Sequence, residues 1–155
     1  MIIFKQHIYF ILFTSILLGG CKSLTGQNDE SNCSKNITIQ YHKASKKDVK
    51  EDMVADKSKN NVVVFLEAYF DGVVKGYVDN KLIFNESIVT DESLGTTEKY
   101  FTYNYSKDNL LPKLKVEIDN DCLEFEIKKD YKLIYLSYYQ ERWDIIYSNV
   151  YPTYE

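Results

Sequence analysis

The second half of the chain alternates apolar and polar residues with a period of two, the pattern of β-strands that bury one face. The clearest example is a hairpin, in which Leu114, Val116 and Ile118 alternate with charged residues, a turn follows at residues 119–121, and alternation resumes from Leu123. Further segments with strand character are residues 62–70, 72–78, 81–89, 99–105, 131–138 and 143–147. No helical pattern alternates with them, which disfavours a fold built from βαβ units.

These segments predict an all-β fold. About seven strands, with turn signals about every ten residues, are typical of an antiparallel β-sandwich of immunoglobulin-like or transthyretin-like size. The polar segment Asp91–Glu98 is the longest interruption of the strand pattern. It is interpreted either as a plain connection between the sheets or as a recognition loop at one end of the sandwich, because such loops are held by the sheets while their side chains stay free.

Residues 1–20 have a different pattern, in which Lys5 precedes an uncharged apolar stretch from Ile8 to Gly20. The stretch is shorter than the roughly 20 apolar residues of a membrane-spanning helix, so it predicts a secretory signal peptide. It ends in Leu18-Gly19-Gly20-Cys21, which resembles the lipobox of bacterial lipoproteins. This resemblance implies that residues 1–20 are removed and that Cys21, carrying acyl chains such as palmitate, becomes a membrane-anchored N-terminus. Ordinary secretion and an uncleaved anchor are the alternatives.

Residues 21–60 are rich in charge and poor in aromatic residues, with Tyr41 as the one aromatic side chain. Such a segment buries too little apolar surface to offset the entropy lost on ordering. We therefore expect a mostly flexible, lipid-anchored tether at residues 21–60 and a β-sandwich domain at residues 61–155. Within the tether, residues 37–41 alternate like a strand, and Asp48–Ala55 has the length of two helical turns.

The chain contains three cysteines. If Cys21 is acylated, Cys33 and Cys122 remain, and in an exported protein they can form a disulfide or stay as two unpaired thiols. The sequence leaves both options open, because pairing depends on geometry. No Cys-x-x-Cys pair is present and His42 is the one histidine of the mature chain, so no metal or other cofactor is expected.

Charge and composition argue against further classes of function. Residues 61–155 carry 17 acidic and 10 basic side chains, so binding to nucleic acid is not expected. His42 lies in the predicted tether, where it cannot be held rigidly beside a nucleophile as its general base. We therefore expect no catalytic residues and no enzyme. Asp119 and Asp121 have the chemistry of a cation site, but a hairpin turn accounts for both.

Tyrosine makes up 12 of the 18 aromatic residues beyond residue 60. Because a tyrosine has an apolar ring and a polar tip, this excess fits either ordinary packing in the sandwich or a contact surface for a protein or a sugar. The candidate surface consists of Tyr131, Tyr135, Tyr138, Tyr139, Trp143 and Tyr147.

The whole chain resembles small bacterial envelope lipoproteins in which a lipidated tether carries one β-sandwich. The resemblance implies a lipid-anchored protein of the cell envelope, and Lys22 in place of an acidic residue after Cys21 favours the outer membrane. We expect a noncatalytic interaction module that binds another envelope protein through a sheet edge or its tyrosine-bearing face. The alternative is a carbohydrate-binding accessory lipoprotein, in which Trp143 and neighbouring tyrosines stack on a glycan.

Overall fold

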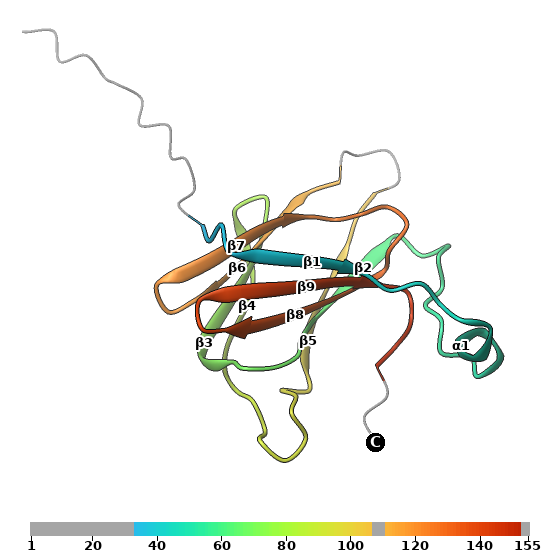
Figure 1. Cartoon of the computed structure of the whole chain (residues 1–155). Coiled ribbons are helices and arrows are strands. Elements are labelled where there is room, and N and C mark those ends of the chain that lie inside the picture. Colours follow the sequence, from blue (N-terminus) through green and yellow to red (C-terminus); the bar gives the residue numbers. More distant parts are fainter. Residues whose placement is uncertain (1–32, 107–110, 153–155) are drawn as a thin grey trace, which may run out of the picture. The chain divides into compact units, whose positions relative to one another are not determined.

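A computed structural model describes residues 33–106 and 111–152, and within these ranges it contains nine strands and one short helix. The elements follow the chain in Figure 1. They are β1 (Ile37–Tyr41), α1 (Lys46–Lys50), β2 (Asn61–Leu66), β3 (Asp71–Val78), β4 (Lys81–Val89), β5 (Lys99–Asn104), β6 (Lys113–Ile118), β7 (Asp121–Glu126), β8 (Leu133–Tyr139) and β9 (Arg142–Ser148).

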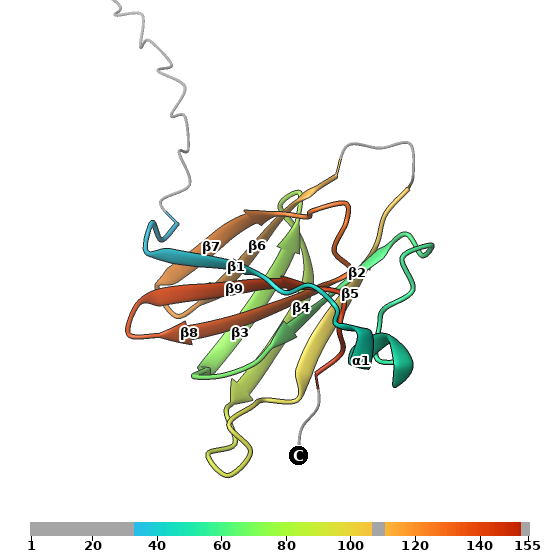
Figure 2. The ribbon, with the colours of Figure 1, turned by 45° about the vertical axis from the view of Figure 1, so that its right-hand side comes forward.

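The strands form two sheets that pack face to face, as Figure 2 shows. One sheet has five strands in the order β1-β9-β8-β2-β5, and the other has four in the order β4-β3-β6-β7. An all-β sandwich, predicted from the alternation of residues, is thereby confirmed. The four-stranded sheet is antiparallel throughout.

Two details of the predicted fold are wrong. The described residues form nine strands where about seven were expected, and the five-stranded sheet is mixed, because β1 runs parallel to β9 and β2 runs parallel to β8. Side chains alternate between the two faces of a strand whatever the direction of its neighbours. The pattern along the sequence therefore shows which residues turn inward, and it carries no information on whether a pair is parallel.

Part of the segment predicted as a tether, residues 21–60, pairs with strands of the sandwich. β1 pairs with β9 over five positions, from Ile37 opposite Trp143 to Tyr41 opposite Tyr147. Further along, Val54 forms a bridge with Val150 in the last described segment. The order of this segment comes from backbone hydrogen bonds to distant strands rather than from its own apolar content. The predicted signal peptide at residues 1–20 and the lipidation site at Cys21 lie outside the described residues.

Helix α1 is stabilised by hydrogen bonds between residues that are close in the sequence. The hydroxyl of Ser45 accepts a hydrogen bond from the Asp48 backbone N–H, and the Asp48 carboxylate accepts one from the Ser45 N–H, which together form a capping box. The bond from the Ser45 backbone N–H is the main cause that lowers the pKa of Asp48. Two helical turns were predicted at Asp48–Ala55, whereas the helix begins at Lys46 and ends at Lys50. It has only five residues, and none of them is buried.

The core lies between the two sheets and is filled by the alternate residues that the pattern marked as apolar. The strands at its centre contribute Val62, Val64, Leu66, Leu114, Val116, Ile118, Leu123, Ile134 and Leu136. Full burial of one such aliphatic side chain stabilises the fold by about 1.5–3 kcal/mol relative to leaving it in water. This core is supplied by both sheets, so each holds the other in place.

A disulfide between Cys33 and Cys122 joins the sheets at one side of the sandwich. Cys33 precedes β1, an edge strand of the five-stranded sheet, and Cys122 lies in β7, an edge strand of the four-stranded sheet. Beside it, the Ser34 backbone N–H donates to the Cys122 carbonyl over 2.7 Å. Of the two options that the sequence left open for these cysteines, the structure contains the bond.

Candidate binding site

The six aromatic residues of the predicted surface do not form one surface. Trp143 and Tyr147 are buried in the core, and the Tyr138 ring packs against Trp143 with its centroid 4.7 Å away. Tyr131 is half-buried, with its ring 5.9 Å from that of Tyr147. Only Tyr135 and Tyr139 lie on the side of β8 that points away from the core.

A stacking role for Trp143 is wrong, because its side chain is 0% exposed and no ligand can reach the ring. Its Nε1–H donates to the Asp121 carboxylate over 3.2 Å. Burial first, and then the nearby Asp121 carboxylate, raise the pKa of Tyr138 to about 12. Burial likewise raises the pKa of Tyr147 to about 12, and the Tyr147 hydroxyl donates to the carbonyl of Glu126 over 2.7 Å. These aromatic groups belong to the packing of the sandwich.

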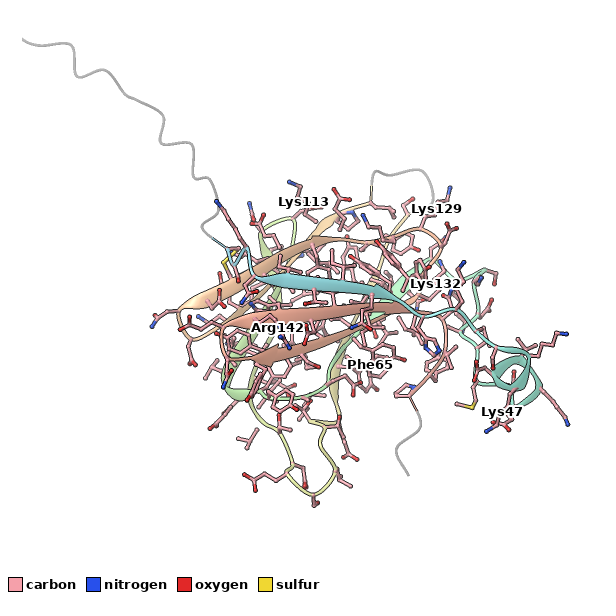
Figure 3. The ribbon with its side chains drawn as sticks, viewed as in Figure 1. Lys47, Phe65, Lys113, Lys129, Lys132 and Arg142 are labelled. Carbon is pink, nitrogen blue, oxygen red and sulfur yellow. A yellow bond between two sulfur atoms is a disulfide. The ribbon has the colours of Figure 1, made fainter. Side chains whose placement is uncertain are left out.

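The outer face of the five-stranded sheet carries three aromatic side chains in a line across three strands. Phe65 of β2 lies opposite Tyr100 of β5 on one side and Tyr135 of β8 on the other. The ring centroids are 5.6 Å apart in the first pair and 5.0 Å apart in the second. Tyr100 is 58% exposed, and Figure 3 marks the position of Phe65 on the sheet. We call Phe65, Tyr100 and Tyr135 the aromatic row.

The outer face of the four-stranded sheet has a different chemistry. There the Lys115 ammonium lies 2.7 Å from the Glu117 carboxylate and 4.7 Å from the centre of the Tyr77 ring. The Tyr77 hydroxyl donates to the same carboxylate over 2.8 Å. The bond from Lys115 is the main cause that lowers the pKa of Glu117, and the bond to Glu117 is the main cause that raises the pKa of Tyr77. This tyrosine is tied into a cluster of charges.

A second exposed aromatic feature lies where the connection between β2 and β3 meets the end of β8. The rings of Tyr69 and Tyr139 are 4.8 Å apart, and the two residues are 61% and 44% exposed. Beside Tyr69 the surface is hollowed into an open groove of about 590 Å³. We call it the tyrosine groove, and it is lined by Ala68, Tyr69, Phe70, Asp71, Val89, Thr90, Glu92 and Gly95.

Two hydrogen bonds hold the turn that presents Tyr69. This residue has φ = 66°, in the left-handed region that a bulky side chain adopts only when its surroundings enforce it. On one side, the backbone N–H of Phe70 donates to the Thr90 hydroxyl over 2.9 Å. On the other, the backbone N–H of Tyr138 donates to the carbonyl of Ala68 over 3.1 Å. The Tyr69 ring is therefore placed by both neighbouring elements.

The polar segment Asp91–Glu98 forms one wall of the groove. The Asp91 carboxylate accepts hydrogen bonds from the Ser93 hydroxyl, the Ser93 N–H and the Leu94 N–H, over 2.6, 2.7 and 3.2 Å. These bonds, led by that from the Ser93 hydroxyl, lower the pKa of Asp91. The Thr97 hydroxyl donates to the carbonyl of Leu66, which fastens the segment to the end of β2. The segment is thus a connection with internal hydrogen bonds, and its Glu92 reaches the groove.

Among residues 33–106 and 111–152, no three His, Cys, Asp or Glu side chains are arranged to hold a metal ion. Asp119 and Asp121 have different structural roles. Asp119 has φ = 52° at the hairpin turn, whereas the Asp121 carboxylate accepts hydrogen bonds from the Trp143 Nε1–H and the Cys122 N–H. The described part of the chain also contains no helix of the length and apolarity that a membrane span requires.

His42 is the one histidine in the described ranges, and its Nδ1 lies 3.4 Å from the hydroxyl of Ser148. Ser148 is buried, and its hydroxyl also accepts a hydrogen bond from the Val150 N–H over 2.9 Å. A hydroxyl enclosed in this way presents no nucleophile to a substrate. The pair therefore joins the end of β9 to the chain that follows β1.

Phe65, Tyr69 and Tyr100 were absent from the predicted surface. Phe65 had a signal in the sequence, because the burial of Val62, Val64 and Leu66 turns the residues between them outward. Tyr69 had none, since its partner Tyr139 lies on a strand far along the chain.

The described residues define a class of structure: a disulfide-linked β-sandwich with one mixed sheet, whose outer face carries aromatic residues. No model of a protein family matches this chain, and neither a curated protein nor a solved structure matches it.

Proposed function

We propose that this protein is a lipid-anchored, noncatalytic interaction module of the bacterial cell envelope, which binds another envelope protein through the outer face of its five-stranded sheet. The observation that carries the proposal is the aromatic row of Phe65, Tyr100 and Tyr135. Aromatic side chains are enriched in protein interfaces because a rigid ring removes much apolar area from water at a small cost in entropy.

The contrast between the two sheets supports this proposal. Both sheets bury their inner faces in the same core, so neither needs aromatic residues on its outer face to fold. The four-stranded sheet carries the cluster of Lys115, Glu117 and Tyr77 at the corresponding place. None of the contacts between aromatic rings of the described residues lies within the four-stranded sheet, whereas the aromatic row spans three strands of the other sheet. A partner surface of matching apolar and aromatic character would account for this row.

The anchoring part of the proposal comes from the resemblance of Leu18-Gly19-Gly20-Cys21 to a lipobox. The disulfide between Cys33 and Cys122 supports an extracytoplasmic location, because structural disulfides persist mainly in oxidising compartments. With an acylated Cys21, only 12 residues would lead to Cys33, a distance of at most about 40 Å along the chain. The module would then act close to its membrane, which we propose to be the outer membrane.

The finer description of the fold is part of the proposal as well. We keep an immunoglobulin-like or transthyretin-like sandwich as the candidate relationship, with the mixed sheet as an addition that either would have to accommodate. The carbohydrate-binding alternative required Trp143 to stack on a glycan, and this side chain is buried. We therefore propose the protein-interaction function in preference to it.

Site-specific photocrosslinking in cells tests the interaction. A photoreactive amino acid in place of Tyr100, on the outer side of edge strand β5, should capture one envelope protein, whereas the same group at the exposed Asn85 of β4 should not. Tyr100→Ser should weaken co-purification of that protein about tenfold, as for an interface anchor. Tyr151→Ser, which removes an exposed tyrosine outside the aromatic row, is the matched control and should leave it unchanged.

Two results would contradict the proposal. If the same protein is captured equally from Tyr100 and Asn85, or if none is captured from Tyr100, the aromatic row is not its binding face. Mass spectrometry of the purified protein tests the anchor separately: an intact Met1 without acylation of Cys21 would refute the lipoprotein assignment and leave the crosslinking result standing.

A further inference from the structure

We propose that the tyrosine groove is a second binding site, whose ligand is a lysine- or arginine-rich segment of a protein partner. The site is distinct from the aromatic row, and it depends neither on that row nor on the lipid anchor. The groove offers the exposed ring of Tyr69 together with the carboxylates of Asp71 and Glu92 in one space of about 590 Å³. No lysine or arginine is among the residues that line it.

Carboxylates lie in the groove and in the turns beside it. They are Asp71, Glu92, Asp119 and Glu141. The Asp119 Oδ1 lies 3.1 Å from the position that a Cβ at Gly72 would take. Because Gly72 directly follows Asp71 in the chain, the Asp119 carboxylate lies near the backbone of Asp71. Glu141 has φ = 60° in the turn between β8 and β9, two residues after Tyr139, whose ring contacts Tyr69. Among the described residues none of the four carboxylates forms an ion pair.

Basic groups lie at the end of the domain with α1, as well as on the four-stranded sheet. Figure 3 shows Lys47, Lys129 and Lys132 on the side of α1, away from Arg142 at the turn between β8 and β9. Arg142 is itself paired with Asp144 over 3.2 Å. The carboxylates of the groove, unpaired among the described residues, therefore attract a cationic segment to this part of the surface.

The chain itself contains the arrangement that we propose for the ligand. On the outer face of the four-stranded sheet, Lys115 lies over the ring of Tyr77 and pairs with Glu117. The tyrosine groove provides the same two partners, a tyrosine ring and a carboxylate, without the cation. A lysine or arginine side chain from a partner can lay its aliphatic stem along Tyr69 and direct its charged head to Glu92 or Asp71.

The geometry of the groove lowers the cost of binding. Hydrogen bonds on both sides of Tyr69 fix its backbone, and its ring rests against that of Tyr139, so the ring is positioned before a ligand binds. A neutral or acidic segment would leave the carboxylates desolvated without a partner, or would be repelled by them. The charge of the groove thus selects a cationic ligand.

Fluorescence anisotropy with a labelled octapeptide of alternating lysine and serine tests the site, using the purified protein with its full chain. We expect binding that weakens as the ionic strength rises to about 0.15 M, because exposed charges are then screened beyond about 8 Å. Tyr69→Asn removes the ring and keeps a residue that tolerates the left-handed φ. It should weaken binding roughly fivefold, as should Asp71→Asn combined with Glu92→Gln.

The matched control is Asp52→Asn combined with Glu51→Gln. It changes the net charge by the same amount next to α1, and Asp52 also has a left-handed φ of 56°. This variant should bind the peptide as the unchanged protein does. The proposal is overturned if the lysine peptide does not bind, if the control loses as much affinity as the groove variants, or if a glutamate and serine octapeptide or a neutral hexasaccharide binds in its place. A failure of crosslinking at Tyr100 would leave these results unaffected.

Discussion

Replacing both Cys33 and Cys122 by serine removes a covalent link between residues 89 positions apart. The chain-entropy relation for a loop of this length gives a stabilisation of about 4–5 kcal/mol at 25 °C, because the link restricts the unfolded chain. This value is an upper limit, since an unfolded chain with residual structure has less entropy for the crosslink to remove. We therefore expect the free energy of unfolding to fall by about 2–5 kcal/mol in the double variant.

The loss should begin at β1. In this strand only Ile37 is half-buried and the other four residues are exposed, so its attachment depends on backbone hydrogen bonds to β9 and on the nearby disulfide. Urea unfolding followed by the fluorescence of Trp143, the one tryptophan in the sequence, measures the global effect. Hydrogen exchange resolved along the chain measures the local one, and amides of β1 should exchange faster in the double variant than those of β8.

Reduction of the unchanged protein provides the control. Treatment with a thiol reductant should reproduce the double variant, and the double variant itself should not respond to the reductant. A decrease of less than about 1 kcal/mol, well below the usual cost of losing a native disulfide, would refute the reasoning. Unchanged exchange in β1 would refute its local part.

Two further outcomes follow from the core. The pKa of Tyr138 and of Tyr147 is raised to about 12, so above pH 10 the unfolded chain releases protons that the folded chain retains. Their contribution to stability is complete below pH 10 and is lost between about pH 10 and 12, which should lower the urea midpoint of unfolding. Tyr138→Phe should make this decline less steep, and an equally steep decline in the variant and the unchanged protein would disprove the reasoning. Leu136→Ala should cost about 2–5 kcal/mol because the side chain is fully buried, whereas Leu94→Ala, at a 53% exposed position, should change the free energy of unfolding by less than about 0.5 kcal/mol, and comparable costs in urea would contradict this assignment of the core.

The strands were predictable because the direction of a side chain on a strand is a local property. The alternation around Val116 and Leu123 located β6, β7 and their turn without reference to the rest of the molecule. The same alternation also indicated a strand at residues 37–41, but its attachment to the sandwich was not predictable in this way. Their segment has little apolar surface of its own, and its order depends on β9 and on a disulfide partner 89 residues away, neither of which is expressed in local composition.

An aromatic surface was predicted from composition, but the six residues named for it do not lie on one face of the sandwich. β8 carries Tyr135 on its outer side and Tyr138 on its inner side, and local hydropathy treats the two alike. Which side faces inward is decided by the other sheet, whose core residues cover Tyr138 and Trp143. The tyrosine groove was even less predictable from the sequence. Tyr69 comes close to Tyr139 only through the parallel pairing of β2 with β8, and the sequence pattern carries no signal for that pairing.

The disulfide also determines how the domain would carry a load applied from its N-terminal side. Tension on the chain before Cys33 reaches β7 in the four-stranded sheet through the covalent bond, and it reaches the five-stranded sheet through β1. Without the bond, the five-residue β1 would bear that tension alone at the edge of its sheet, where hydrogen bonds can break one after another. Because the aromatic row lies on β2, β5 and β8 of this same sheet, a crosslink that relieves β1 keeps the proposed binding face intact while the chain is held from its N-terminal side.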